Sequence, residues 1–190
     1  MVGVRGLYLA FLGLLYLERL AELFVSRRNA RIALARGGIE IGLQHYAVMV
    51  AVHAVFPLAC GAEAIGLHRG FPGAIGVAAL GLALAAQALR WWAVVTLGWR
   101  WNTRVIAVPG LAPVTTGPYR FLRHPNYLAV LVEAAAVPLI AGAWLSAVVF
   151  LAANAALLAI RIPLEERALG PSYAAAFAGH RRFVPGAPHA

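Results

Sequence analysis

The sequence predicts an all-α membrane protein, a polytopic bundle of about five transmembrane helices, and two observations support this. Of the 190 residues, 62% are hydrophobic and only 12% are charged, about half the charged share that is usual in soluble domains. Long apolar stretches alternate with short connections that carry arginine. A chain with so few polar side chains cannot cover a surface that faces water, whereas lipid accepts apolar side chains on the outside of a bundle.

Five apolar segments are candidates for these helices. They are Val4–Val25, Leu43–Leu67, Gly73–Leu97, Tyr127–Ala141 and Trp144–Ile160. A hydrocarbon core of about 30 Å requires about 20 helical residues, so the first three segments are long enough to cross. The last two are short and flank a break at Pro138–Gly142, which predicts a tight helical hairpin. An amphipathic cytoplasmic helix is expected near the C-terminus.

The whole chain is expected to form one domain, residues 1–190. Residues 1–97 hold the first three helices. Residues 98–183 hold a long polar loop, the helical hairpin and a C-terminal segment.

The distribution of charge predicts the orientation of the bundle. All sixteen basic residues are arginine and all seven acidic residues are glutamate, which gives a net charge of +9. With the N-terminus outside, twelve arginines lie on the cytoplasmic side: Arg27, Arg28, Arg31, Arg36, Arg100, Arg104, Arg120, Arg123, Arg161, Arg167, Arg181 and Arg182. Only Arg5 and Arg69 lie outside, so the positive-inside rule favours an N-out, C-in protein. The same placement explains a sequence pI near 11 without a nucleic-acid partner.

The sequence gives no sign of a metal site or an internal disulfide. Cys60 is the single cysteine, and the six histidines show no ligand-like spacing with partner carboxylates.

The stretch from Gly117 to Tyr127 concentrates residues that suit ligand chemistry. It reads G-P-Y-R-F-L-R-H-P-N-Y and holds two arginines, one histidine, two tyrosines and two prolines in eleven positions. Each proline fixes its own backbone and restricts the residue before it, so the polar side chains are held in place. Arginine pairs with carboxylates and tyrosine faces attract cations, so a ligand with a carboxylate and a sulfonium group suits this set.

A second polar pattern follows the last apolar segment. Arg161 and Glu165 are four residues apart and so share one helical face. Alone, the pair is more consistent with a surface ion pair of little energetic value.

Together, the loop and the segment R-I-P-L-E-E-R-A-L that begins at Arg161 resemble the isoprenylcysteine carboxyl methyltransferase family, which is related to membrane phospholipid methyltransferases. The resemblance implies S-adenosylmethionine (SAM) as cofactor without a Rossmann domain, and the chain has no G-x-G-x-x-G after a strand. By this resemblance the cofactor contacts are Leu111, Ala112, Pro113, Val114, Tyr119, His124, Pro125, Asn126, Tyr127 and Glu165. It also implies that Arg161 faces the substrate.

Further motifs are similar to a bacterial branch of this family that O-methylates alkylresorcinols or alkylpyrones. They are E-I-G-L-Q-H-Y from Glu40, R-W-W from Arg90 and W-N-T-R from Trp101. This resemblance implies a phenolic lipid as acceptor, taken from the bilayer. Arg161 would stabilise a phenolate, and His45 is the candidate catalytic base because an ordinary imidazole pKa near 6.5 suits proton removal. The expected substrate-binding residues are Arg161, His45, Tyr46, Trp92 and Asn102.

Charged residues also occur inside the first apolar run. Glu18, Arg19 and Glu22 would be costly in lipid, so we expect them to face the bundle and to pair structurally, with Arg90 as a partner. Aromatic residues such as Trp91 and Trp92 are typical of an interfacial belt.

Several alternatives remain open from sequence. The acceptor could be a prenylcysteine carboxylate or a phospholipid amine, and a sterol-reductase-like or transporter function is less consistent with the pattern. The sequence predicts the inner membrane of a bacterium with the site facing the cytoplasm. It does not predict the oligomeric state.

Overall fold

The computed structural model describes residues 2–184 as a bundle of long helices. The helices are α1 (Val2–Ala35), α2 (Leu43–Gly66), α3 (Ala74–Leu97), α4 (Pro125–Leu139) and α5 (Trp144–Ala176). Two 3₁₀ turns, η1 (Gly98–Arg100) and η2 (Gly117–Arg120), and two strands, β1 (Ile39–Ile41) and β2 (Val105–Ala107), complete the fold. The predicted all-α membrane bundle is confirmed.

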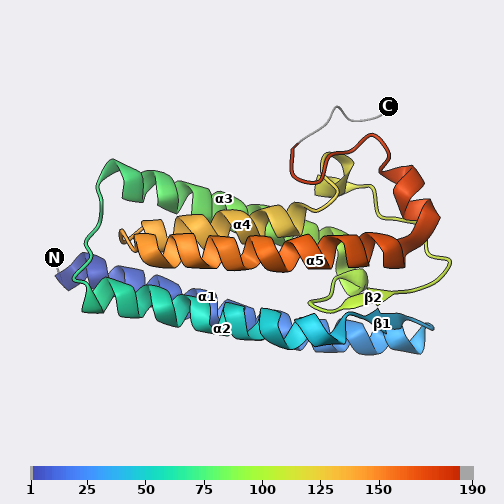
Figure 1. Cartoon of the computed structure of the whole chain (residues 1–190), viewed down its shortest axis with the longest axis horizontal. Helices are drawn as coiled ribbons and strands as arrows, with labels where there is room; N and C mark the ends of the chain where they lie inside the picture. The colour runs from blue at the N-terminus through green and yellow to red at the C-terminus, as the bar shows by residue number, and fades with distance from the viewer. Residues whose placement is uncertain (1, 185–190) are drawn as a thin grey trace.

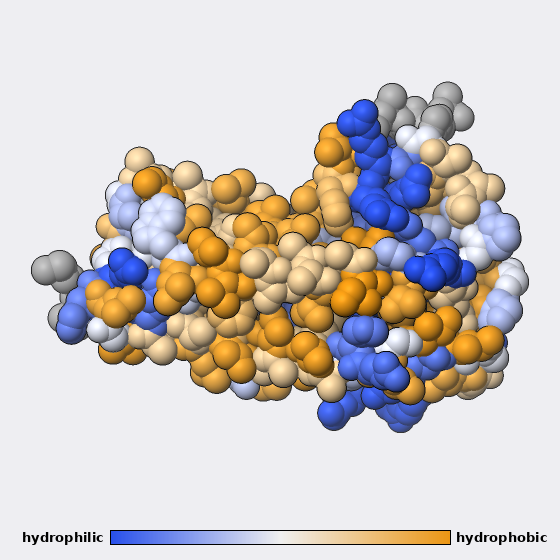
Figure 2. All heavy atoms as spheres, viewed as in Figure 1, coloured by the Kyte–Doolittle hydropathy of each residue, from blue (hydrophilic) through white to orange (hydrophobic). Residues whose placement is uncertain are grey.

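The helices form two packed groups that run along the long axis of the molecule (Figure 1). Helix α4 packs between α3 and α5, while α2 packs on α1 and also contacts α5. The strands, both 3₁₀ turns and the C-terminal segment gather at the end opposite the N-terminus (Figure 1). Figure 2 shows an apolar surface along the helices and hydrophilic residues concentrated at that same end.

Within residues 2–184, three helical stretches are long and apolar enough to cross a membrane. They are Leu43–Gly66, Ala74–Arg100 and Trp144–Ala176. Helix α4 is apolar but has only 15 residues, as the short hairpin arm predicted. Helix α1, which contains the predicted segment Val4–Val25, has 34 residues but is not one of these three stretches, and it carries the charges Glu18, Arg19 and Glu22.

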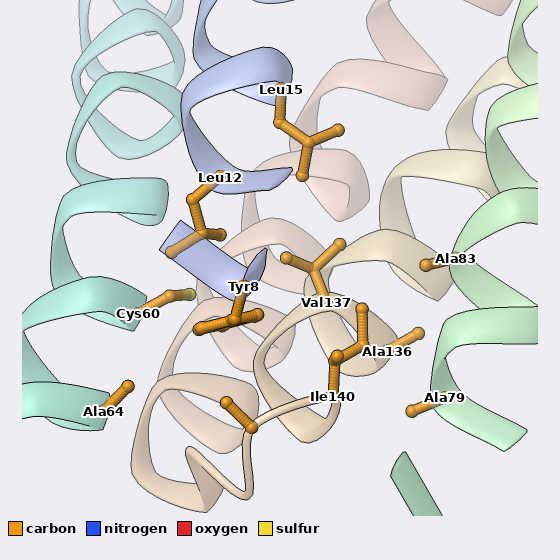
Figure 3. Close-up of a cluster of buried hydrophobic side chains, with 11 residues drawn as sticks. Tyr8, Leu12, Leu15, Cys60, Ala64, Ala79, Ala83, Ala136, Val137 and Ile140 are labelled. Carbon is orange, nitrogen blue, oxygen red and sulfur yellow. The ribbon is translucent and has the colours of Figure 1, made fainter. Parts of the chain in front are cut away.

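Small side chains make the hydrophobic core at the N-terminal end of the bundle compact. Tyr8 and Leu12 of α1 meet Cys60 of α2, while Ala79 and Ala83 of α3 face α4 (Figure 3). Ala83 and Cys60 have no exposed surface. Alanines at this contact let the α3 and α4 backbones approach closely, as is common between membrane helices.

Two helices extend beyond their predicted ends. Helix α1 continues from Val25 to Ala35, since no glycine or proline interrupts this stretch, and it ends before Gly37, which has φ 79°. The prediction of a short fifth helix was wrong, because α5 continues beyond Ile160 to Ala176. The C-terminal helix predicted as a separate element is the last part of α5, set off by non-helical geometry at Gly170.

The two strands were not predicted from the sequence. Ile39, Glu40 and Ile41 pair antiparallel with Ala107, Ile106 and Val105. Each strand has only three residues, too short for an alternating pattern to stand out. The pair joins the α1–α2 connection to the long polar loop, and Arg104 reinforces it by hydrogen bonds to both carboxylate oxygens of Glu40 at 3.3 Å.

Candidate active site

The loop before α4 is held in one conformation by glycine, proline and backbone hydrogen bonds. Gly117 has φ 57°, and a Cβ there would collide with Thr96, so this position requires glycine. Pro118 lies in the η2 turn and Pro125 begins α4, where a missing N–H costs no hydrogen bond. The backbone N–H groups of Tyr127 and Leu128 donate to the His124 carbonyl at 3.1 Å, which starts the helix.

The C-terminal segment is hydrogen-bonded to the backbone of this loop. The backbone N–H groups of Arg123 and His124 donate to the carbonyls of Arg181 and Arg182 at 3.2 and 3.3 Å. Arg123 Nε also donates to the His180 carbonyl at 2.6 Å. We refer to residues 180–182 as the C-terminal strap. The strap contacts the loop through backbone groups and through the Arg123 side chain, contacts that the sequence motif alone does not reveal.

The two adjacent glutamates of α5 have different partners. Glu166 receives hydrogen bonds from Arg182, and its Oε1 lies 3.1 Å from His124 Nε2. Glu165 accepts a hydrogen bond from the Tyr127 hydroxyl. Glu166 therefore holds the strap to the loop, while Glu165 faces the space enclosed by the loop.

Arg161 is positioned by three separate elements. Its Nε donates to the Tyr127 hydroxyl at 2.7 Å, its Nη2 donates to the Thr103 carbonyl at 2.6 Å, and its Nη1 lies 3.3 Å from the sulfur of Met49. Among the described residues, no carboxylate forms an ion pair with Arg161 within 4.0 Å. Its charge thus remains available to an anionic ligand group.

Tyr119 lies buried behind the loop, where burial raises the pKa of its phenol well above the ordinary value of 10. The hydroxyl therefore stays protonated at neutral pH. The Tyr119 side chain is thus uncharged, and its hydroxyl can donate a hydrogen bond but does not act as a base.

A cavity of about 440 Å³ connects these groups, which is within the usual range for ligand pockets. One part is lined by the loop, the residues from Val108 to Val114, Glu165 and Tyr173. The other part continues between the helices and is lined by His45, Met49, Val50, Leu157 and Leu158, together with charged residues of α1 and α3. Arg161 lies on the wall of the same cavity.

Most of the predicted site residues line this cavity. They are His45, Asn102, Leu111, Ala112, Pro113, Val114, Tyr119, His124, Asn126, Tyr127, Arg161 and Glu165. The structure thus brings together residues from α2, the polar loop, α4 and α5.

Three predicted contacts do not line the cavity. Pro125 is fully buried at the first turn of α4, where it braces the loop. Trp92 lies on an outer face of α3 with 49% of its surface exposed, as an interfacial belt residue would. Tyr46 contacts residues of the polar loop instead: its hydroxyl lies 3.3 Å from Thr103 Oγ1, and its ring lies under the Arg104 guanidinium. Its place in the sequence beside His45 does not put it on the same side of α2, because neighbouring helical residues point about 100° apart.

Some structural residues of the site were missed. Ser26 Oγ donates to Asn102 Oδ1 at 2.6 Å, and Asn29 Nδ2 donates to the Trp101 carbonyl at 2.8 Å. Both residues lie in the stretch that we had assigned to a connection, although their spacing of three places them on one helical face. These hydrogen bonds hold Trp101, Asn102 and Thr103 against α1. They thereby position the Thr103 carbonyl, which accepts a hydrogen bond from Arg161.

Several polar atoms at the cavity wall have unfilled hydrogen-bonding capacity. Among the described residues, His45 Nδ1, Asn126 Oδ1 and Trp101 Nε1 are buried without a hydrogen-bond partner. An unpaired buried polar atom is costly, so such atoms on a cavity wall mark places where a ligand supplies the missing partner.

Comparison with known proteins agrees with this geometry. Residues 79–171 match the isoprenylcysteine carboxyl methyltransferase (ICMT) family. The chain is 35% identical over 158 residues to the uncharacterised protein YpbQ of Bacillus subtilis, an alignment that covers 83% of this chain and 94% of that protein. It is also 27% identical over 152 residues to an uncharacterised protein of Haemophilus influenzae, covering 80% and 88% of the two chains. The protein is therefore an integral membrane member of the isoprenylcysteine carboxyl methyltransferase family, a family of membrane methyltransferases.

Proposed function

We propose that this protein is a SAM-dependent methyltransferase that methylates an oxygen of a lipophilic acceptor, a phenolic lipid such as an alkylresorcinol or alkylpyrone. One observation carries the proposal: a single cavity joins the R-H-P-N-Y loop to an apolar space between the helices, with Arg161 on its wall. A methyl donor from water and an acceptor from lipid could therefore meet at Arg161.

The residues of the loop fit SAM. Asn126 offers a buried, unpartnered carbonyl oxygen that needs a donor such as an amino or ribose hydroxyl group. Glu165 adds a carboxylate, and the partly exposed residues Leu111–Val114 offer backbone groups on the facing wall. When bound, SAM supplies an electrophilic methyl group on a sulfonium centre.

The protein itself has two tasks in such a reaction. The first is to align the acceptor oxygen with the methyl group and to exclude water, which the loop and the C-terminal strap would do. The second is to handle the proton of a phenol. His45 Nδ1 lies unpartnered on the cavity wall and is the candidate base, while Arg161 would stabilise the resulting phenolate.

The surroundings of Arg161 favour an anionic oxygen over an amine as acceptor. A guanidinium that lacks a carboxylate partner attracts a phenolate or carboxylate and repels the cationic form of an amine. Phospholipid N-methylation is therefore disfavoured. A prenylcysteine carboxylate remains a second candidate, since Arg161 could bind its carboxylate directly.

The distribution of arginine supports a cytoplasmic site in a bacterial inner membrane. Hydrophilic residues concentrate at the end that carries the loop and the C-terminal strap (Figure 2). By the positive-inside rule that end faces the cytoplasm, where SAM is made. The whole of 1–190 would act as one domain.

The test is a methyl-transfer assay on protein purified in detergent. SAM with a labelled methyl group is mixed with an alkylresorcinol, a prenylcysteine or a phosphatidylethanolamine, and the labelled product is identified by mass spectrometry. We expect label on the resorcinol oxygen. Label on the prenylcysteine carboxylate instead would select the second candidate. Absence of transfer to all three, in protein whose melting temperature SAM does not raise, would overturn the proposal.

A further inference from the structure

The apolar part of the cavity ends on charged and polar side chains inside the bundle. Arg19 and Glu22 of α1, His53 of α2, Arg90 of α3 and Asn154 of α5 all line it. We call Glu22, His53, Arg90 and Asn154 the polar floor. A cavity that held only a hydrocarbon tail would gain nothing from such residues, because burying charge against alkyl groups is costly.

Structural pairing alone does not account for the number of carboxylates here. Arg90 donates to Glu133 through Nε at 3.0 Å and Nη2 at 2.5 Å, and Arg19 pairs with Glu18 at 3.1 Å. These two contacts already give each arginine a carboxylate. Glu22 is a third carboxylate next to two arginines, so neutralising the arginines does not require it.

One oxygen of Glu22 has no hydrogen bond. Its Oε2 lies 2.8 Å from Arg19 Nη1, but its Oε1 lies 3.7 Å from Arg90 Nη1, too far for a hydrogen bond. The residue is 94% buried, with a relative exposure of 6%. This buried oxygen therefore lacks a donor, in a residue that lines the cavity.

The other members of the floor also present acceptors. His53 Nδ1 lies 2.8 Å from the Met49 carbonyl and so carries the hydrogen, which leaves Nε2 as an acceptor in the neutral ring. Asn154 Nδ2 donates to the Phe150 carbonyl at 2.8 Å, which leaves its Oδ1. The donors of Arg90 are directed mainly to Glu133. The floor is rich in acceptors and poor in free donors.

Arg161 and the floor line the same cavity. Met49, which contacts Arg161, and His53 are four residues apart on α2, about 6 Å along the helix. The floor residue His53 is therefore about one helical turn from the residue that contacts Arg161.

From this arrangement we infer that the polar floor is a specificity subsite that accepts a hydrogen bond from a second hydroxyl on the acceptor's ring, with Glu22 Oε1 as the principal acceptor. The inference rests on the proposed function and narrows it from any lipophilic phenol to dihydroxylated ones. A neutral hydroxyl supplies the single hydrogen-bond donor that Glu22 Oε1 lacks. A site built to bond a hydroxyl discriminates strongly against the analogue that lacks it.

The experiment compares an alkylresorcinol with the alkylphenol that has the same tail and one hydroxyl fewer. For the unaltered protein we expect kcat/KM for the resorcinol to exceed that for the phenol by roughly 10- to 100-fold, as a hydrogen bond to a charged group provides. Glu22→Leu should remove this preference and Glu22→Gln should reduce it to a few-fold. Unchanged SAM affinity in both variants shows that they are folded, and the Gln variant, which keeps the side-chain shape, decides the question where the Leu variant does not fold.

Glu18→Leu is the matched control. Glu18 also lies on α1 and binds Arg19, Gln87 and Trp91, but it does not line the cavity. Its variant should keep the full preference for the resorcinol. Equal kcat/KM values for the two acceptors in the unaltered protein, or a preference that Glu22→Gln leaves intact, would overturn the inference.

A binding measurement separates this inference from the proposed function. The rise in melting temperature that each lipid causes is measured with S-adenosylhomocysteine present. A larger rise with the resorcinol that depends on Glu22 supports the subsite even when neither lipid is methylated, in which case only the proposed reaction fails. Equal rises for both lipids in the unaltered protein would contradict the subsite whatever the enzyme methylates.

Discussion

The two halves of the bundle use the same helices in opposite ways. Near the N-terminus, Tyr8 and Leu12 of α1 and Cys60 of α2 pack with the alanines of α3 and α4 into a closed core. Toward the strands and the loop, α1, α2 and α5 instead line a cavity with histidine, arginine and glutamate. Small apolar side chains fill the half near the N-terminus, which we call the core half. Polar side chains line the half near the loop, which we call the cavity half. Stability and chemistry are thus separated along the length of the helices.

Replacing His45 should have the largest effect of the changes that test this separation. His45→Ala removes the candidate base, and general-base catalysis is worth roughly 10²- to 10⁴-fold. We expect kcat for a phenolic acceptor to fall by that factor while the Kd for SAM stays the same, with partial recovery on adding imidazole. Unchanged turnover would assign proton removal to another group.

Replacing Arg161 should produce a somewhat smaller loss. Arg161→Ala removes the charge held by Tyr127 and Thr103, and the loss of one group that stabilises an oxyanion costs roughly 10²- to 10³-fold in kcat. The comparison is made between acceptors in steady-state assays. A loss confined to SAM binding, with turnover intact at saturating SAM, would place Arg161 on the cofactor instead.

Glu165→Ala should act on cofactor binding. A hydrogen bond to a charged group is worth roughly 10- to 100-fold in affinity, so the Kd for SAM from calorimetry should rise by about that factor. Glu40→Ala is the control, since Glu40 pairs with Arg104 at the strands and does not line the cavity. Ordinary SAM affinity in the Glu165 variant would remove this residue from the cofactor site.

A change in the core half should lower stability and leave activity unchanged. Ala83→Leu introduces a large side chain where Ala83 is fully buried between α3 and α4, and overpacking of this kind costs about 1–3 kcal/mol. We expect a lower melting temperature, with kcat and SAM affinity of the folded protein close to those of the parent. A large fall in kcat without loss of stability would mean that the two halves are not independent.

The sequence predicts the bundle well because hydrophobic segments and arginine-bearing connections are local signals. Most of the residues predicted from the R-H-P-N-Y motif, together with Arg161, line one cavity. This prediction also rests on a local signal, because the motif specifies both the backbone and the side chains. Trp92 shows the limit. Its neighbour Arg90 points into the bundle, whereas Trp92 lies two residues further around the helix and faces outward.

Features that depend on contacts between distant segments could not be predicted. The pairing of Ile39–Ile41 with Val105–Ala107 involves three residues on each side, and the C-terminal strap binds through backbone atoms and through the side chains of Arg123 and Glu166. Neither segment carries a sequence pattern that identifies its partner. The expected pairing of Glu22 with Arg90 is present at 3.7 Å, but the closer partner of Arg90 is Glu133, and this pairing was not predicted.

The length of α5 has a consequence for how the enzyme responds to its surroundings. From Trp144 to Gly170 the helix rises about 40 Å, so one continuous helix connects the end of the bundle near the N-terminus to Arg161 and Glu165 (Figure 1). Membrane helices adjust to thinner or thicker bilayers by changing their tilt. Tilting α5 would move both side chains relative to the loop before α4, so under the proposed function turnover should depend on the acyl-chain length of the surrounding lipids.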